Sequence, residues 1–168
     1  VIHKGVVDAI AWQEAIDAVA VEEKWQQVEA IVAAKTSPEK AKEFVTAFKN
    51  MYADYSDDVV SWIANLYDPE TGGFYYSNSA RNTEGFLPDI ESTAQILDAL
   101  QSTGMLEGRG NSYANAFDAE TRAKILKFAK DLQSPADGYF YHEQWGRSIT
   151  TSRRGRDLGW ATQIIKKF

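Results

Sequence analysis

Two parts of the chain have nearly the same sequence. One contains LYDPETGGFYY at residues 66–76 and DIESTAQIL at residues 89–97, and the other contains LQSPADGYFYH at residues 132–142 and DLGWATQII at residues 157–165. Equivalent positions lie 66 residues apart in the first motif and 68 residues apart in the second. An internal period of this kind predicts a repeat architecture that is built from one supersecondary unit.

Apolar residues recur at helical spacing in six stretches of the chain. We expect helices from Val6 to about Ala34, after Pro38, after Ser56 or Asp57, from Asp89 to just before Gly104, after Asp118, and from Asp157 onward. Ser37 and Pro38 supply an N-cap and a proline at the first helical position, which is a typical helix start. Asp89, Asp118 and Asp157 are expected to be N-caps as well, as is one of Ser56 and Asp57.

The same spacing predicts which side chains of each helix are buried. The helix after Pro38 is expected to bury Ala41, Phe44, Phe48, Met51 and Tyr55, and the next helix Val59, Ile63 and Leu66. The helix after Asp89 is expected to bury Ile90, Ala94, Leu97 and Leu100, and the one after Asp118 Ile125, Phe128, Ala129 and Leu132. The last helix is expected to bury Leu158, Ala161, Phe168 and one of Ile164 and Ile165.

No run of alternating apolar and polar residues predicts a sheet. Short aromatic pieces at residues 73–76 and 139–141 each follow a proline and a glycine, so we expect small hairpins inside loops there. The sequence therefore predicts a single all-α domain whose helix pairs are joined by long, aromatic loops. Its expected parts are N-terminal helices at 1–55, a first repeat at 56–104 and a second, truncated repeat at 118–168.

Composition limits the function classes. The chain has 168 residues, which suffices for one domain with a sizeable core. Its net charge of −6 argues against general nucleic-acid binding, and the absence of cysteine excludes disulfides and thiolate metal ligands. No segment reaches the roughly 18 apolar residues of a membrane span, and none has the pattern of a signal peptide. Export stays open, and the compartment is undetermined.

The end of the second repeat predicts that the chain is a fragment. The last helix is still apolar and in register at Phe168, and no glycine or proline ends it. The second repeat also lacks a tail like the DALQSTG at residues 98–104. The alternative is that the terminus simply frays. An open arc of repeats would leave apolar surface uncovered, so we expect a homodimer or a missing C-terminal half to complete it.

These motifs resemble the repeat of the α/α-toroid superfamily, which includes terpenoid cyclases and protein prenyltransferase β subunits. GGF at residues 72–74, followed by DIEST at residues 89–93, is similar to that repeat. FAKDLQSPADGYF at residues 128–140 is similar to the glutamine-and-aromatic repeat of the triterpene cyclases. The resemblance covers about residues 59–104 and 122–168. It implies helical hairpins that form an arc or part of an (α/α) toroid, with the helix after each loop on the inside.

The residues depart from the best-known activities of that superfamily. The resemblance implies a zinc ion held by Asp, Cys and His in the prenyltransferases, but this chain has no cysteine and its two histidines lie far apart. It implies an Asp-x-Asp-Asp motif in the cyclases that protonate their substrates, and the nearest segment, YSDD at residues 55–58, is better explained as a helix cap. We therefore expect neither a metal nor a cofactor. The superfamily also hosts polysaccharide lyases and other sugar-active enzymes, and the fold does not choose among them.

Aromatic side chains gather in the two loops. They are Tyr75, Tyr76, Tyr139, Tyr141 and Trp145. Flat aromatic rings with polar rims are suited to stacking on sugar rings, so we consider Tyr75, Tyr76 and Trp145 candidate substrate-binding residues. The alternative is that these rings pack the loops against the helices.

The second loop also carries candidate catalytic groups. Tyr141 and His142 are candidate bases for β-elimination in a uronic-acid polymer, a reaction that needs a cation to neutralise the carboxylate. Arg147, Arg153 and Arg154 are candidates for that cation, because no acidic residue lies among them and guanidinium binds carboxylate in a bidentate manner. A solvated basic loop and a structural histidine are the alternatives.

Acidic residues at the expected inner helix starts complete the candidate site. Asp89 and Glu91 form a pair at one start, and Asp157 is the equivalent of Asp89 at the other. They are candidate substrate-binding or acid–base groups. The alternative makes Asp89 an N-cap and Glu91 a first-turn acid that faces the helix dipole.

Three function classes follow from the sequence. The first is a carbohydrate-active toroid module that binds, and as a lyase or hydrolase cleaves, an acidic or neutral glycan through the two aromatic loops. The second is a non-catalytic scaffold whose concave face binds a protein partner. The third is part of a prenyl or terpenoid enzyme, which would need an aspartate cluster for magnesium diphosphate that the sequence does not supply.

Overall fold

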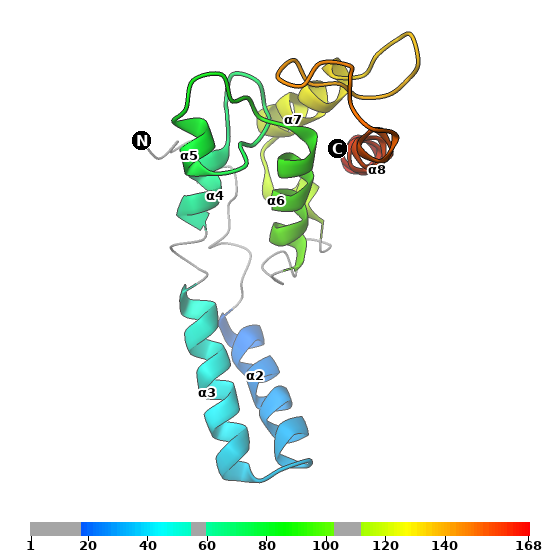
Figure 1. Ribbon diagram of the computed structural model, residues 1–168. Helices are drawn as coiled ribbons and strands as arrows, with labels where there is room; N and C mark the ends of the chain where they lie inside the picture. Colours follow the sequence, from blue (N-terminus) through cyan, green and yellow to red (C-terminus); the bar gives the residue numbers. More distant parts are fainter. Residues whose placement is uncertain (1–17, 55–59, 103–111) are drawn as a thin grey trace.

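The computed structural model describes residues 18–54, 60–102 and 112–168, and these residues are mostly helical, with no strand among them (Figure 1). The all-α prediction is confirmed. The helices are α2 (Ala18–Ala33), α3 (Pro38–Asp54), α4 (Val60–Leu66), α5 (Asn78–Arg81), α6 (Ile90–Ser102), the 3₁₀ helix η2 (Tyr113–Ala116), α7 (Ala119–Asp131) and α8 (Thr151–Lys167). The expectations for residues 6–17, for Tyr55 and Val59, for the caps at 56–57 and for Gly104 lie outside the described residues.

Helices α2 and α3 form an antiparallel pair (Figure 1). The predicted start of α3 is confirmed, since the backbone N–H of Lys40 donates to the Ser37 hydroxyl at 3.3 Å. An ion pair of 2.8 Å between Lys49 and Glu22 joins the two helices. The pair is therefore held by a local cap and by contacts along its length.

The buried face of α3 differs from the prediction. Ala41 and Val45 are buried, whereas Phe44, Phe48 and Met51 are exposed. The two phenylalanine rings lie 4.6 Å apart, centroid to centroid, and the ring of Phe48 meets that of Trp25 on α2 edge-on at 6.5 Å. The spacing of apolar residues does not indicate which of two neighbouring faces of α3 is buried.

The main core lies among α4, α6, α7, α8 and η2. In this region α6 contacts both α8 and η2, and α8 also contacts α7. The largest fully buried side chains are Tyr113, Phe74, Phe140, Ile63, Leu66, Ile90, Leu97, Leu100, Ile125 and Ile164. Most of the inward positions predicted for α4, α6 and α7 are therefore confirmed.

Helix α8 begins earlier than predicted. It starts at Thr151, and Thr150 is its N-cap, accepting from the backbone N–H of Arg153 at 3.1 Å. Asp157 consequently lies inside the helix, so its prediction as an N-cap is wrong. Arg153 and Arg154 belong to α8 and not to a flexible loop. Leu158 is exposed, against the prediction, because the buried stripe of α8 runs through Asp157, Ala161 and Ile164.

Two turns of equivalent sequence have the same backbone hydrogen bonds. In the first turn (residues 66–75) Gly72 donates to the carbonyl of Asp68 at 2.8 Å, and in the second turn (residues 132–141) Gly138 donates to that of Ser134 at 2.8 Å. Both glycines have positive φ, 86° and 76°, which glycine adopts without strain. A single antiparallel bridge closes each turn, which confirms the small hairpins expected there.

The two turns differ in what covers them. A methyl group at Gly72 would lie 2.4 Å from the backbone oxygen of Lys124, and one at Gly73 would lie 2.7 Å from the ring of Phe128. Both contacts come from α7, which therefore packs directly on the first turn. A methyl group at Gly138 would meet nothing within 4 Å. The space next to Gly138 in the second turn is therefore open among the described residues.

Candidate functional site

Six of the predicted site residues lie close together at the start of α6. They are Asp89, Glu91, His142, Trp145, Arg153 and Asp157. They come from three places in the chain: the start of α6, the loop that follows the second turn, and the first half of α8. We call this group the α6 cluster.

Arg153 links the three parts of the α6 cluster. Its Nε donates to Asp157 at 3.0 Å and its Nη1 donates to Glu91 at 2.6 Å, while its guanidinium carbon lies 4.4 Å from the ring centroid of Trp145. The side chain of Arg153 is only 18% exposed. Charge-assisted bonds of this kind are strong when they are shielded from water. Arg153 is therefore a structural link between α6, α8 and the loop.

Asp157 is buried and only partly satisfied. Its side chain is 0% exposed, and its Oδ1 has no hydrogen-bond partner among the described residues. Burial raises the pKa of this carboxyl, while the hydrogen bond and charge of Arg153 oppose the rise. The carboxylates of Asp89 and Glu91 raise this pKa further. Asp157 faces its arginine partner inside the protein, where a substrate in solvent does not reach it.

His142 is a buried hydrogen-bond acceptor. It is 4% exposed, and its Nε2 accepts the backbone N–H of Ile90 at 3.4 Å. This bond requires the neutral tautomer with its proton on Nδ1. Burial, together with the smaller effect of the Arg153 charge, lowers the pKa of His142 to about 4. Its ring also meets Trp145 edge-on, with centroids 4.9 Å apart. A role as a general base would require the bond to Ile90 to break.

The acidic pair at the start of α6 caps the helix and pairs with arginine. Asp89 is buried, and its two carboxylate oxygens accept the backbone N–H of Ser92 at 2.8 Å and its hydroxyl at 2.7 Å. Glu91 accepts from Arg153, and Arg156 lies 3.9 Å from its other oxygen. The N-cap interpretation of Asp89 is thus confirmed, and α6 begins at the next residue.

A second group of predicted residues lies on the second turn. The guanidinium carbon of Arg147 is 4.4 Å from the ring centroid of Tyr141, and its Nη2 donates to Ser134 at 2.7 Å and to Asp137 at 3.3 Å. The Tyr141 hydroxyl donates to the same Asp137 carboxylate at 2.9 Å. Nearby, the guanidinium carbon of Arg154 is 5.8 Å from the ring centroid of Tyr139. Tyrosine and arginine thus alternate on this surface.

The predicted residues of the first turn stand apart from both groups. Tyr75 is half-buried, and burial raises the pKa of its hydroxyl. Tyr76 is 73% exposed. In residues 60–102 and 112–168 no hydrogen bond or ring contact joins either tyrosine to Tyr141, Trp145 or the arginines. No contact among the described residues therefore supports the expectation of one site shared by both loops.

Sequence reasoning missed several residues that shape these groups. Asp137 and Ser134 anchor Arg147, and the side-chain oxygen of Gln144 accepts the backbone N–H of Leu87 at 2.9 Å. This last bond spans 57 residues and holds the loop against the segment before α6. Asp137 had a usable signal, because aspartate just before a turn glycine commonly bonds the local backbone. No local sequence signal indicates the long-range bond of Gln144.

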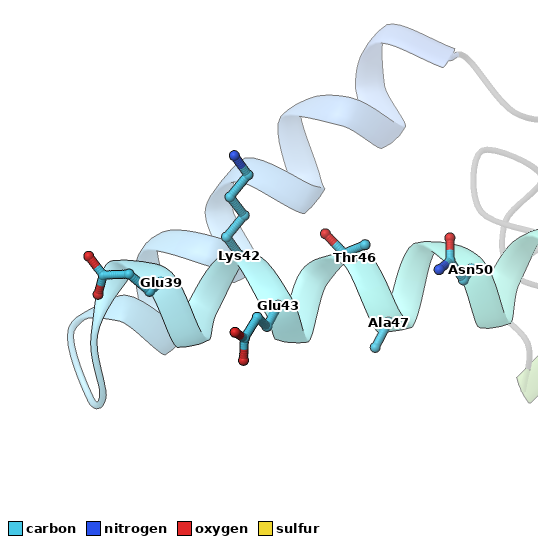
Figure 2. A pocket seen from close by; sticks show the side chains of 6 residues that line it. All are labelled: Glu39, Lys42, Glu43, Thr46, Ala47 and Asn50. Carbon is cyan, nitrogen blue, oxygen red and sulfur yellow. The ribbon is translucent and has the colours of Figure 1, made fainter.

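A hollow in the described part of the chain lies away from both groups. It has a volume of about 580 Å³ and runs along α3 (Figure 2). Its lining residues are Glu39, Lys42, Glu43, Thr46, Ala47 and Asn50. They come from one helix and do not converge on a common point, so this hollow does not define a site.

Further chemistry was sought in the described part of the chain. No group of three or more His, Cys, Asp or Glu side chains in it has the arrangement of a metal site. No helix there has both the length and the apolar character needed to cross a bilayer. The polar chemistry of the described residues is thus concentrated in the α6 cluster and on the second turn. The chain matches no protein-family model, no curated protein and no solved structure.

Proposed function

We propose that this chain is a carbohydrate-binding module in which the second turn and the loop after it contact the sugar. The observation that carries the proposal is the exposure of aromatic and guanidinium groups on this loop. Trp145 is 41% exposed although Arg153 covers part of its ring, and the side chain of Arg147 is 59% exposed beside Tyr141.

These groups have the chemistry of a sugar-binding surface. Tyrosine and tryptophan combine a flat apolar face with one polar group and lose little conformational freedom on binding. Guanidinium donates several hydrogen bonds in a fixed plane, to hydroxyl or carboxylate oxygens. The Ser134 and Asp137 contacts hold Arg147 in place before a ligand arrives, which reduces the entropy lost on binding.

The geometry favours binding over cleavage. Of the two candidate bases, His142 is buried with its Nε2 already occupied. Tyr141 is more accessible, but its hydroxyl donates to Asp137 and carries its own proton. Were the module a lyase, Tyr141 would be the residue able to reach a substrate. The binding proposal needs neither group to transfer a proton.

We infer an α/α-toroid architecture for the chain as part of the same proposal. The shared motifs and the identical hydrogen bonds of the two turns support it, because equivalent turns join equivalent helices in a repeat fold. The completion of the arc by a second copy or by further helices also remains a proposal.

Replacing Trp145 by alanine is expected to lower the affinity for a bound glycan by about tenfold or more, since losing a stacked aromatic anchor commonly costs about 2 kcal/mol. The matched control is Trp62→Ala, because Trp62 on α4 is 44% exposed and lies outside the loop. A glycan array identifies the ligand, and calorimetry compares the variants. Equal affinities for both variants, or no glycan bound by the parent chain, would rule the proposal out.

A protein-interaction scaffold is the second candidate. It is favoured by the exposed apolar side chains of α3, which include Phe44, Phe48 and Met51. Exposed apolar patches often mark protein contacts. Light scattering on the parent chain and on Phe48→Glu tests whether this surface mediates association, and a monomer in both cases would remove self-association from consideration.

A further inference from the structure

We propose that the outer face of the second turn binds the carboxylate group of an acidic sugar, through Arg154 and Arg147 above Tyr139 and Tyr141. This inference rests on the proposed function and names its ligand class. It also identifies Arg154 as the residue that selects for charge and Tyr139 as the ring beneath it.

The two turns differ in how much space is open beside their glycines. Their backbones have the same hydrogen bonds, but α7 covers the first turn through Lys124 and Phe128. The second turn carries Tyr139 where the first carries Gly73, and space is open next to Gly138. The first turn thus packs against α7, whereas the second turn, with the same backbone, has open space beside it.

The two tyrosines share one face of the turn. Tyr139 and Tyr141 are two residues apart in an extended segment, and Phe140 between them is buried in the core. Side chains two apart in extended backbone point to the same side. Both rings therefore face away from the core, and each carries a guanidinium, at 5.8 Å for Arg154 and 4.4 Å for Arg147.

The charges on this face are not balanced. Arg153 and Arg156 both lie near Glu91, and Arg147 pairs with Asp137. Arg154 has no ion pair within the described ranges, and its Nε is buried there without a hydrogen-bond partner. A half-buried, unneutralised guanidinium is less well hydrated than a free one, so it gains more from an incoming carboxylate.

The arrangement fits a sugar acid better than a neutral sugar or a free anion. The tyrosine faces offer stacking area for a pyranose ring, and the guanidinium groups above them offer donors to a carboxylate on that ring. A uronic-acid oligomer supplies both features on every residue. A neutral oligosaccharide supplies only the first, and inorganic sulfate supplies only charge.

The test measures binding of trigalacturonate, maltotriose and inorganic sulfate to the parent chain, Arg154→Gln and Arg156→Gln at low salt. Arg156 is the matched control, since it is an arginine of α8 that lies near Glu91 and contacts neither tyrosine of the turn. We expect Arg154→Gln to weaken trigalacturonate binding by about tenfold or more, and Arg156→Gln to change it by less than about twofold. Maltotriose binding should be the same for all three chains. Arg154→Lys, which keeps the charge, is expected to recover part of the affinity.

The outcomes separate this inference from the proposed function. If maltotriose binds as well as trigalacturonate and Arg154→Gln changes neither, the charge-selective site is wrong while glycan binding stands. If sulfate displaces trigalacturonate at equal concentration, the site recognises anions and not sugar acids. If no saccharide binds, both proposals fail. Circular dichroism of each variant confirms that any loss comes from the site, and Tyr139→Leu gives a second test should Arg154→Gln fail to fold.

Discussion

Gly72→Ala is expected to destabilise the protein by about 3 to 5 kcal/mol, whereas Gly138→Ala is expected to cost only about 1 to 2 kcal/mol. Both glycines have positive φ, so both substitutions incur the strain of a side chain in the left-handed region. Only at Gly72 would the new methyl group also lie 2.4 Å from a backbone oxygen, that of Lys124, which cannot move without shifting α7. The extra cost therefore measures how tightly α7 packs on the first turn.

Thermal and denaturant unfolding of the two variants provide the measurement. For a chain of this size each kcal/mol lowers the melting temperature by about 2 to 4 °C, so Gly72→Ala should melt roughly 10 °C below the parent. Equal losses for the two variants would contradict the packing of α7 on the first turn. Phe128→Ala combined with Gly73→Ala adds a check, because a methyl group at Gly73 would lie 2.7 Å from both the Phe128 ring and the Cβ of Pro88. Removal of the ring relieves only the first contact, so the double variant should recover part of the loss.

Local signals in the sequence predicted the local structure well. The caps at Ser37, Asp89 and Asp118 were found because each involves a side chain and a backbone N–H only three residues apart. The start of α8 was missed because Thr150 precedes Arg153, Arg154 and a glycine, and no apolar residue marks the first turn there. Asp157 was then mistaken for the cap, since it is the first position with an apolar pattern after it.

The candidate site was predictable as a set of residues but not as an arrangement. The arginine and aromatic side chains of residues 139–154 were identified from their clustering in the sequence. Their pairing was not, because the bond from Arg153 to Glu91 spans 62 residues and depends on how α6 and α8 pack. The same packing buries His142 and turns a candidate base into a structural acceptor. Chemistry that depends on tertiary contacts has no local pattern in the chain.

His142 is expected to make the fold sensitive to mild acid. Burial lowers the pKa of its folded form to about 4, below the ordinary value of 6.5. The unfolded chain therefore binds a proton between pH 6.5 and 4 that the folded chain does not, and stability falls as the pH is lowered through this window. The stabilisation present above pH 6.5 and lost by pH 4 amounts to about 3 kcal/mol.

Urea unfolding at pH 7 and pH 4.5 tests this expectation in the parent chain, His142→Gln and Asp157→Asn. Glutamine can accept the Ile90 N–H without titrating, so His142→Gln should lose much less stability than the parent over this range. The contribution of Asp157 to the pH dependence of stability has the opposite sign. Its pKa is raised in the folded state, so the folded chain takes up a proton before the unfolded chain as the pH falls, and this adds stability in acid. Asp157→Asn should therefore show a steeper loss than the parent. If His142→Gln keeps the parent's pH dependence, protonation of His142 does not cause the loss of stability in acid.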